Sequence, residues 1–141
     1  MKPIIDNLEF LLVRIGRAHH NRAREEFESI GLGRGQIPVI MNLFAEDGQT
    51  NSQLAKKMDV TPATMTNLVK RMEAAGFVYR QRGVKDERVS RVHLTEKGRD
   101  IVSQIREKAD EMDTVMFAGF SNEERVELRS YMERILNNLE I

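Results

Sequence analysis

The stretch from about Thr50 to Leu94 constrains the fold of this chain more than any other, because its hydrophobic period changes from helical to alternating. Thr50 with Gln53 three residues later forms a capping box, which predicts that a helix begins at Thr50. Thr61 followed by Pro62 predicts the start of a second helix after a tight turn. The stretch is therefore expected to fold into two short helices and then a β-hairpin.

The second of these helices is expected to span residues 62–75. Its apolar residues recur at helical spacing and so share one face, as in a helix that packs on a core: Met65, Leu68, Val69 and Met72. Gly76 suits the position after a helix end. Residues 77–82 and 88–94 are predicted strands joined by a charged turn, and the inner face of the second strand would carry Ser90, Val92 and Leu94.

Two further helices are expected before this stretch. An N-terminal helix from Ile4 to about Phe27 has an apolar face of Ile4, Ile5, Leu8, Leu11, Leu12 and Ile15. Three glycines within residues 29–35 end it, because glycine is unfavourable inside a helix. A helix over 36–45 follows, with Pro38 in its first turn and an apolar face of Ile37, Ile40, Met41 and Phe44.

Two helices are also expected after the hairpin. Thr95 caps a long helix whose apolar residues are Ile101, Ile105, Met112 and Met116. A second capping box, Ser121 with Glu124, begins a last helix that carries Leu128, Met132, Ile135, Leu136 and Leu139. The predicted fold is mainly α with a small β-hairpin, and the helix pair with its hairpin makes a winged helix-turn-helix.

Composition excludes several classes of protein. The chain has 141 residues, the size of one domain, and no cysteine, which excludes disulfides, thiolate zinc sites and thiol redox sensing. It has no apolar run long enough for a transmembrane helix, and its N-terminus lacks the apolar stretch of a signal peptide. We expect a cytoplasmic protein without a membrane partner.

Charge is distributed unevenly although the net charge is zero. Residues 49–98 hold 10 lysines and arginines against 5 aspartates and glutamates, whereas the rest of the chain holds 12 against 17. A basic middle between acidic flanks is the electrostatic pattern of a nucleic-acid-binding protein. Chance segregation of charge is the alternative.

The helix over 62–75 is the candidate reader of double-stranded DNA. Its outward polar side chains would be Thr64, Thr66, Asn67, Lys70 and Arg71. Asn67 can pair bidentately with adenine, and the threonines offer a hydroxyl and a methyl group to thymine. Lys70 and Arg71 are better suited to phosphates, which fix position rather than sequence. A solvated helix face is the alternative for an isolated helix.

Further DNA contacts are expected on both sides of this helix. Thr50, Asn51 and Ser52 at the start of one helix, and Thr61 at the start of the next, can offer hydroxyl and backbone N–H groups to phosphates. The hairpin carries Arg80, Arg82, Lys85, Arg88 and Arg91. Of these, Arg88 is expected to enter the minor groove, and Arg82 and Lys85 are expected to contact DNA. Asp86, in the same turn, is expected to orient Arg88 or Lys85 by an ion pair.

These motifs, in this order, resemble the MarR family of bacterial regulators over nearly the whole chain. The matching motifs are Leu54-Ala55, Thr64 to Thr66, Met72-Glu73-Ala74-Ala75-Gly76, Arg80, Asp86-Glu87-Arg88 and Leu94-Thr95-Glu96-Lys97-Gly98. Asn67 departs from the pattern, since many relatives have a basic residue there, and this puts the DNA sequence preference in doubt.

The resemblance implies a homodimeric transcription regulator, which we expect to be a repressor. Residues 1–141 would form one domain, with a winged lobe over 36–96 and a helical dimerisation region over 1–34 and 98–141. Apolar residues at both chain ends agree with this: Ile4, Ile5, Leu136, Leu139 and Ile141. A monomer in which these helices pack on each other is the alternative. The dimer would bind a pseudo-palindromic duplex with half-sites about 10 base pairs apart, helix 62–75 in the major groove and wing 80–91 in the minor groove.

Many members of the family respond to small aromatic or anionic effectors, so the resemblance also implies an effector. The motifs do not carry ligand residues over, and only by position could Arg17, His20, Ile37 and Met41 line such a site. His19 and His20 are adjacent on a helix and point about 100° apart, which makes joint metal binding difficult.

Two other classes of function are open to a chain of this kind. One is a winged-helix module for protein–protein contact without DNA binding, which loss of the basic wing residues would favour. The other is an enzyme, but the sequence has no nucleophile–base pair, metal-ligand spacing or phosphate loop. We therefore expect no catalytic activity, cofactor or metal.

Overall fold

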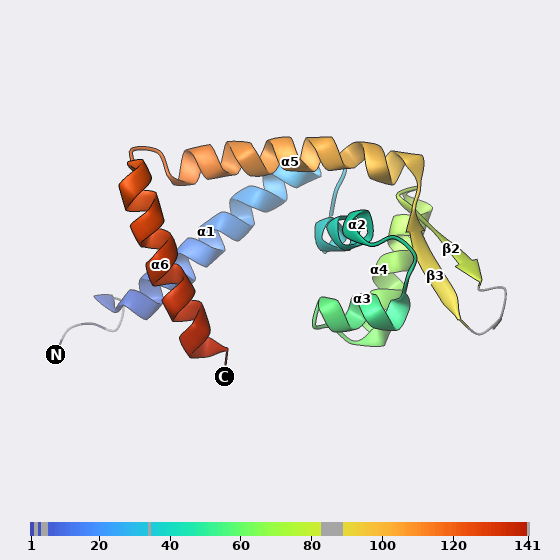
Figure 1. Cartoon of the computed structure of the whole chain (residues 1–141), viewed down its shortest axis with the longest axis horizontal. Helices are drawn as coiled ribbons and strands as arrows, with labels where there is room; N and C mark the ends of the chain where they lie inside the picture. Colours follow the sequence, from blue (N-terminus) through green and yellow to red (C-terminus); the bar gives the residue numbers. More distant parts are fainter. Residues whose placement is uncertain (2, 4–5, 34, 83–88, 141) are drawn as a thin grey trace. The chain divides into compact units, whose positions relative to one another are not determined.

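A computed structural model describes residues 1, 3, 6–33, 35–82 and 89–140. The elements are α1 (Leu8–Glu28), α2 (Gln36–Ala45), β1 (Gln49–Thr50), α3 (Asn51–Lys57), α4 (Pro62–Ala74), β2 (Val78–Arg82), β3 (Ser90–Leu94), α5 (Glu96–Met116) and α6 (Asn122–Leu139). This part of the chain is mostly helical with one small sheet, which confirms the predicted fold class (Figure 1). It forms two compact units, residues 1–108 and 109–141, so the boundary falls within α5.

The helix boundaries predicted from capping residues are confirmed. The Thr50 hydroxyl accepts a bond from the Gln53 N–H, and the Gln53 side chain accepts one from the Thr50 N–H. Thr61 caps α4 and Pro62 takes its first position. The same reciprocal box joins Ser121 to Glu124 at the start of α6. These local bonds satisfy backbone donors that a helix start leaves without partners.

The hairpin is antiparallel, and its pairs run from Val78 with Leu94 to Arg82 with Ser90. A short third strand, β1, pairs with the other edge of β3, so the strand order is β1-β3-β2. The sequence does not predict β1, because two residues are too few to reveal a strand period. The consequence is that β3 is central and β2 forms an outer edge.

A single core holds the winged lobe together. It lies between α2, α3, α4, the sheet and the first part of α5, and it includes the four predicted apolar residues of α4. Its buried members are Leu32, Val39, Ile40, Leu43, Leu54, Ala55, Met65, Leu68, Val69, Met72, Phe77, Val78, Val92, Leu94, Ile101, Val102 and Ile105. The core of the winged lobe therefore extends beyond residues 36–96, to Leu32 and to Ile101, Val102 and Ile105 of α5.

The predicted apolar face of α2 is partly wrong. Its buried residues are Val39, Ile40 and Leu43, whereas Phe44 is exposed and lies under the Arg106 guanidinium at 5.3 Å. Ile37 and Met41 are half-buried against the core. Because most residues of α2 are apolar, its sequence alone does not single out the face that other elements will cover.

The Leu-Thr-x-x-Gly motif closes the end of α4 against the start of α5. Thr95 donates its hydroxyl proton to the Gly76 carbonyl and accepts a bond from the Gly98 N–H at 3.0 Å. Lys97 donates to the Ala75 carbonyl at 2.7 Å. At Gly98 a Cβ atom would lie 2.2 Å from the Phe77 carbonyl oxygen, so no other residue fits this close approach. The motif fixes the hairpin between two helices.

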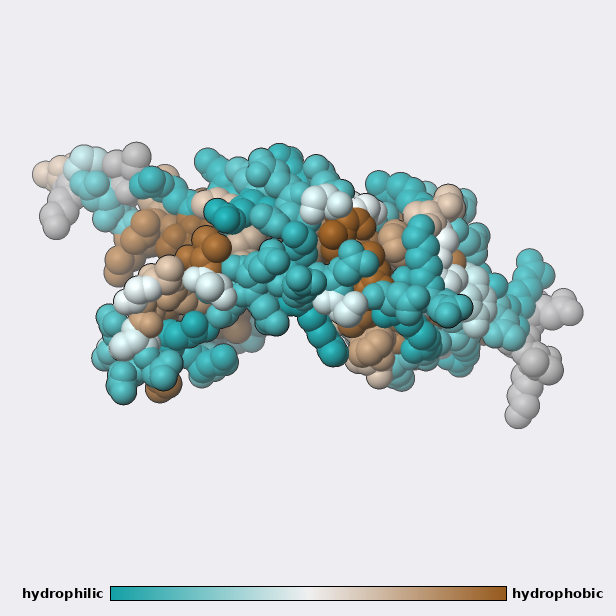
Figure 2. All heavy atoms as spheres, turned by 90° about the horizontal axis from the view of Figure 1, so that it is seen from above, coloured by the Kyte–Doolittle hydropathy of each residue, from teal (hydrophilic) through white to brown (hydrophobic). Residues whose placement is uncertain are grey.

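Helices α1 and α6 differ from the lobe because neither contains a buried residue. Their apolar side chains are exposed, among them Leu11, Leu12, Ile15, Ile135 and Leu136. Figure 2 shows apolar surface (brown) lying open among polar residues (teal). Residues 4 and 5, where α1 was predicted to begin, lie outside the described residues, as does Ile141. None of the described helices is long and apolar enough to cross a membrane.

Candidate nucleic-acid interface

The outer face of α4 carries the predicted reader side chains. Thr64, Asn67, Lys70 and Arg71 are exposed, and Thr66 is half-buried. The opposite face is buried in the core, so α4 cannot turn without breaking that packing. The structure thus holds a row of polar and basic side chains on a rigid helix, facing solvent.

Hydrogen bonds at the start of α4 fix which groups the threonines present. The Thr61 hydroxyl accepts from the Thr64 N–H at 3.1 Å and donates to the Thr64 hydroxyl at 2.9 Å. Thr64 can therefore still donate its own proton. The Thr66 hydroxyl donates to the Pro62 carbonyl at 2.9 Å, one turn earlier. Its hydroxyl proton is thus already used within the helix, which leaves its methyl group for an outside contact.

Asn51 links the two short helices. Its side-chain amide donates to the Pro62 carbonyl at 3.1 Å, which joins the start of α3 to the start of α4. Thr50 is engaged in its capping box, and Ser52 is exposed. A DNA contact by these residues stays a prediction. In the structure, the Asn51 side chain connects the starts of the two helices.

The turn between α3 and α4 contains backbone strain. Asp59 has a φ of 52°, the only positive value at a residue other than glycine within the described residues. Left-handed backbone costs energy for any side chain, although aspartate tolerates it better than most residues. The predicted turn at Asp59 and Val60 is thus present.

The wing is described at its base and not at its tip. Arg82 and Arg91 are exposed on β2 and β3, and Arg91 donates to the Gly48 carbonyl at 2.9 Å. Lys85, Asp86 and Arg88 lie outside the described residues. Groove entry by Arg88 and its orientation by Asp86 therefore stay predictions.

Arg80 is bound to Glu73, which the sequence analysis did not foresee. The Arg80 guanidinium lies 3.1 Å from Oε1 and 3.4 Å from Oε2 of Glu73, and the Arg80 backbone N–H donates to Oε2 at 3.2 Å. These bonds hold the pKa of Glu73 below its usual value. Glu73 is part of the Met-Glu-x-x-Gly motif. It lies seven residues before Arg80, on the other side of the Gly76 turn, and this spacing of opposite charges was the sequence signal for an ion pair.

Asp47 forms a second cluster, at the base of β3. Its carboxylate accepts from the Leu94 N–H and from Arg99, each at 2.9 Å, and lies 3.2 Å from Nδ1 of His93. The His93 ring stacks on Tyr79 with the ring centres 5.2 Å apart. Burial raises the pKa of Asp47, but the Leu94 and His93 bonds and the Arg99 charge lower it more.

A hollow of about 280 Å³ lies between the end of α1, the glycine loop and the start of α2. Of the four residues predicted by position for an effector, His20 and Ile37 line it, and Arg17 and Met41 do not. Arg24, Phe27 and Pro38 line it as well, which sequence reasoning missed. Among the described residues, the hollow therefore combines apolar walls with Arg24 and His20.

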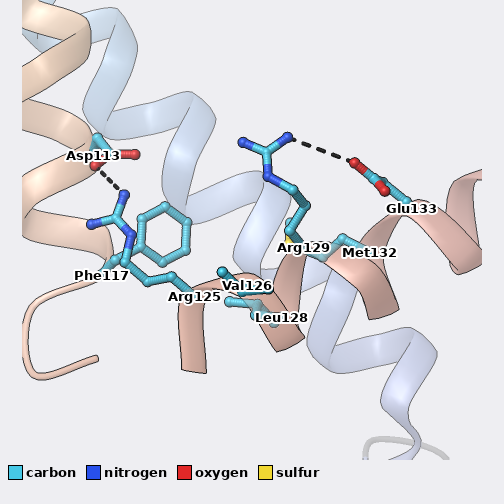
Figure 3. A pocket seen from close by; sticks show the side chains of 8 residues that line it. All are labelled: Asp113, Phe117, Arg125, Val126, Leu128, Arg129, Met132 and Glu133. Carbon is cyan, nitrogen blue, oxygen red and sulfur yellow. Dashed lines mark hydrogen bonds and ion pairs between the residues drawn. The ribbon is translucent and has the colours of Figure 1, made fainter. Parts of the chain in front are cut away.

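The second unit has a hollow of its own, of about 380 Å³, between the end of α5 and α6 (Figure 3). Arg125 pairs with Asp113 at 2.6 Å and covers the Phe117 ring at 5.1 Å, while Val126 and Met132 supply apolar wall. Among the described residues, no three His, Cys, Asp or Glu side chains gather to hold a metal ion.

Comparison with known proteins gives a consistent result. Residues 32–90 match the MarR family model. The chain is 25% identical over 126 residues to the uncharacterised HTH-type transcriptional regulator YybA of Bacillus subtilis, with 89% of this chain and 84% of YybA covered. It is 30% identical to a MarR transcriptional regulator from Methanosarcina mazei Go1, with a TM-score of 0.78 and coverage of 94% and 90%. The S. aureus MepR–DNA complex has the same fold, with 24% identity, a TM-score of 0.81 and coverage of 94% and 98%.

Proposed function

This chain belongs to the MarR family of transcriptional regulators, and we propose that it is a dimeric repressor that binds a pseudo-palindromic DNA duplex. The family and the relatives are regulators of transcription and not enzymes. The observation that carries the proposal is the exposed polar and basic face of α4, held rigidly by a buried opposite face. The S. aureus MepR fold in complex with DNA supports DNA as the partner.

In the proposed complex α4 lies in the major groove. Asn67 is fully on the outer face and contacts a base edge, with adenine as the preferred partner because an amide can bond both N6 and N7. Thr64 offers a hydroxyl proton and Thr66 a methyl group. Lys70 and Arg71, one turn later, bind phosphates and set the register.

The start of α3 and the wing complete the proposed contact. Thr50, Asn51, Ser52 and Thr61 present the starts of two helices to the backbone of the duplex, where hydroxyl and N–H groups suit phosphates. Arg82, Lys85 and Arg88 supply positive charge from the hairpin, with Arg88 as the minor-groove residue and Asp86 as its orienting partner.

We propose that the exposed apolar faces of α1 and α6 are covered by a second copy of the chain. Buried residues are absent from both helices although both are amphipathic, which is typical of elements that pack against a partner. The helical region for dimerisation is proposed over 1–34 and 98–141, and the winged lobe over 36–96. A two-fold dimer would place its α4 helices in half-sites about 10 base pairs apart.

An effector site is proposed in the hollow beside α2. Apolar walls from Phe27 and Ile37 suit an aromatic ring, and Arg24 with His20 suits an anionic group. Arg17 and Met41, proposed from sequence alone, lie outside the lining. An effector bound here would change the placement of α1 against the lobe and so the spacing of the two α4 helices.

The experiment is selection of bound sites from a random duplex pool, followed by titration at two salt concentrations. Lys70→Ala is expected to weaken binding to all sequences and to reduce the salt slope by about one unit. Asn67→Ala is expected to change the preference among sequences by about 1–3 kcal/mol at one base position. Arg22→Ala, an exposed residue of α1, is the matched control.

Three results would each contradict a part of the proposal. Wild-type protein without salt-dependent binding would exclude the DNA interface and favour a winged-helix module for protein contact. Selected sites without two-fold symmetry would exclude the dimeric arrangement. Equal behaviour of Lys70→Ala and Asn67→Ala on specific and random DNA would remove the division between anchor and reader.

A further inference from the structure

The ion pair between Glu73 and Arg80 joins the two DNA-facing elements of the lobe. Glu73 lies in the last turn of α4 and Arg80 in the middle of β2. Three separate bonds connect them, from Nη2, Nε and the backbone N–H of Arg80 to the two oxygens of Glu73. A single carboxylate thus holds both the side chain and the backbone of the strand.

The backbone bond comes from the position of β2 in the sheet. β2 is an outer strand in the order β1-β3-β2, so half of its N–H groups face away from β3. The Arg80 N–H is one of these, and Glu73 supplies its acceptor. The edge of the sheet is thereby attached to the recognition helix, and the hairpin cannot swing away without exposing this N–H.

The side-chain bonds determine what Arg80 can bind. Glu73 is three residues after Lys70 on α4, which places the two on the same side of the helix. Arg80 and Arg82 are two residues apart on β2 and share one face of the strand. Arg80 is thus on the side of the lobe where Lys70 and Arg82 are proposed to meet phosphates, yet its guanidinium is taken up by Glu73.

We propose that Glu73 is a positioning residue that withholds Arg80 from the DNA backbone and fixes the wing to α4. The inference rests on the proposed function, since it assumes that α4 and the wing bind DNA. Every phosphate contact raises affinity for all sequences alike, so withholding one lowers non-specific binding without a loss of base contacts. The fixed angle lets helix and wing meet their grooves together.

The test compares the salt dependence of random-duplex binding for Glu73→Gln and Arg80→Gln in the full-length protein. Glu73→Gln frees Arg80, so the slope of log K against log salt should become steeper by about 0.9, which is roughly 3.5-fold between 50 and 200 mM salt. Arg80→Gln removes a cation that binds no phosphate, so its slope should equal that of the wild type. Glu73→Gln should also lose discrimination between the selected site and random DNA, because its neutral amide holds the wing more weakly. Arg80→Gln keeps the backbone N–H bond to Glu73 and should keep most of its discrimination.

The asymmetry of the two slopes decides the outcome. Long-range charge alone would change the slopes by equal and opposite amounts, and that result would overturn the proposal. A shallower slope in Arg80→Gln alone would also overturn it, because Arg80 would then bind phosphate in the wild type. The double variant should return to the wild-type slope. If the wild type binds DNA in a salt-dependent way but the two variants change the slope by equal and opposite amounts, only this inference is wrong. If the wild type does not bind DNA, the proposed function is wrong as well.

Thermal unfolding of each variant controls for folding. The pair is on the surface, with side-chain exposures of 40% and 37%, so neither change removes core packing. Glu73→Asp separates the two kinds of bond, since it keeps the charge that pairs with the guanidinium but shortens the reach to the Arg80 N–H. Its slope should stay at the wild-type value while its discrimination falls, and a steeper slope in this folded variant would contradict the assignment of withholding to the side-chain bonds.

Discussion

The helices of the winged lobe and the helices α1 and α6 all have apolar residues at helical spacing, but these residues are buried in the lobe and exposed in α1 and α6. In the lobe, the apolar residues at helical spacing on α4 are buried, and those of α2, α3 and β3 meet them in one core. In α1 and α6, apolar residues at the same spacing are exposed. The apolar residues of the lobe are thus buried against one another, whereas the apolar side chains of α1 and α6 are exposed.

The largest effect is expected in the core of the lobe. Leu43→Ala removes a fully buried side chain and should lower the free energy of unfolding by about 2–5 kcal/mol. Because the lobe closes on itself, the loss should be the same at low and high protein concentration. Denaturant titration at two concentrations measures it, and Val126→Ala on exposed α6 is the control. A loss of unfolding free energy that depends on protein concentration would show that the stability of the lobe depends on association, and would contradict the difference between the lobe and the helices α1 and α6.

A smaller effect, on a different quantity, is expected for α6. Leu136→Ala should leave the fold of the lobe intact but weaken self-association by about 1.5–3 kcal/mol, since a leucine buried at an interface contributes in this range. Sedimentation over a concentration series measures the dissociation constant. Asn137→Ala, the next residue on the same helix, tests whether any change on α6 has this effect. Unaltered association in Leu136→Ala would mean that a second copy does not cover this face.

The turn at Asp59 tests whether the closed lobe still contains strain. Asp59→Val should lower the free energy of unfolding by about 1–2 kcal/mol, because a β-branched residue is poorly tolerated at a φ of 52°. Asp59→Gly should leave it close to the wild-type value, because glycine adopts this backbone freely but loses more conformational freedom on folding. Chemical unfolding of both variants provides the comparison. Equal stability of the two would show that the turn relaxes and contains no strain.

The smallest effect concerns the acid stability of the Asp47 cluster. The pKa of Asp47 lies below its ordinary value of 3.8, so its ionised form stabilises the fold above that pH. The contribution is lost as the pH falls through the lowered value. Asp47→Asn should therefore be less stable than wild type at about pH 5, and the difference should shrink at about pH 3. Melting curves at the two pH values test this, and a difference that grows on acidification would contradict it.

Local signals in the sequence were sufficient for most of the fold. The capping pairs at Thr50 and Ser121 and the Thr61-Pro62 start are confirmed, because a cap depends on residues three positions apart. The apolar face of α4 is also confirmed, because the helical period depends on residues three and four positions apart. The two-residue strand β1 and the buried face of α2 were not predicted correctly, because both depend on which distant segment lies beside them.

For the candidate site, the sequence predicted the polar face of α4. It did not predict the hydrogen bonds and ion pairs that the residues around this face make. Arg80 was grouped with the basic residues of the wing, and only the fold places it on Glu73. The side-chain bond from Asn51 to Pro62 spans the turn between two helices and was likewise not foreseen. Such bonds need two elements at a particular angle, which residue types do not specify.

The sequence by itself determined the order of the helices and of the hairpin strands, the starts of α3, α4 and α6, and the face that α4 presents, because backbone bonding and hydrophobic period act within a few residues. Only the tertiary structure decided that Glu73 holds Arg80, that β1 completes the sheet, and that α1 and α6 keep apolar faces uncovered in one chain. The physical reason is distance along the chain. A contact between residues far apart in sequence depends on how whole elements pack, and that packing is set by the core rather than by the residues that make the contact.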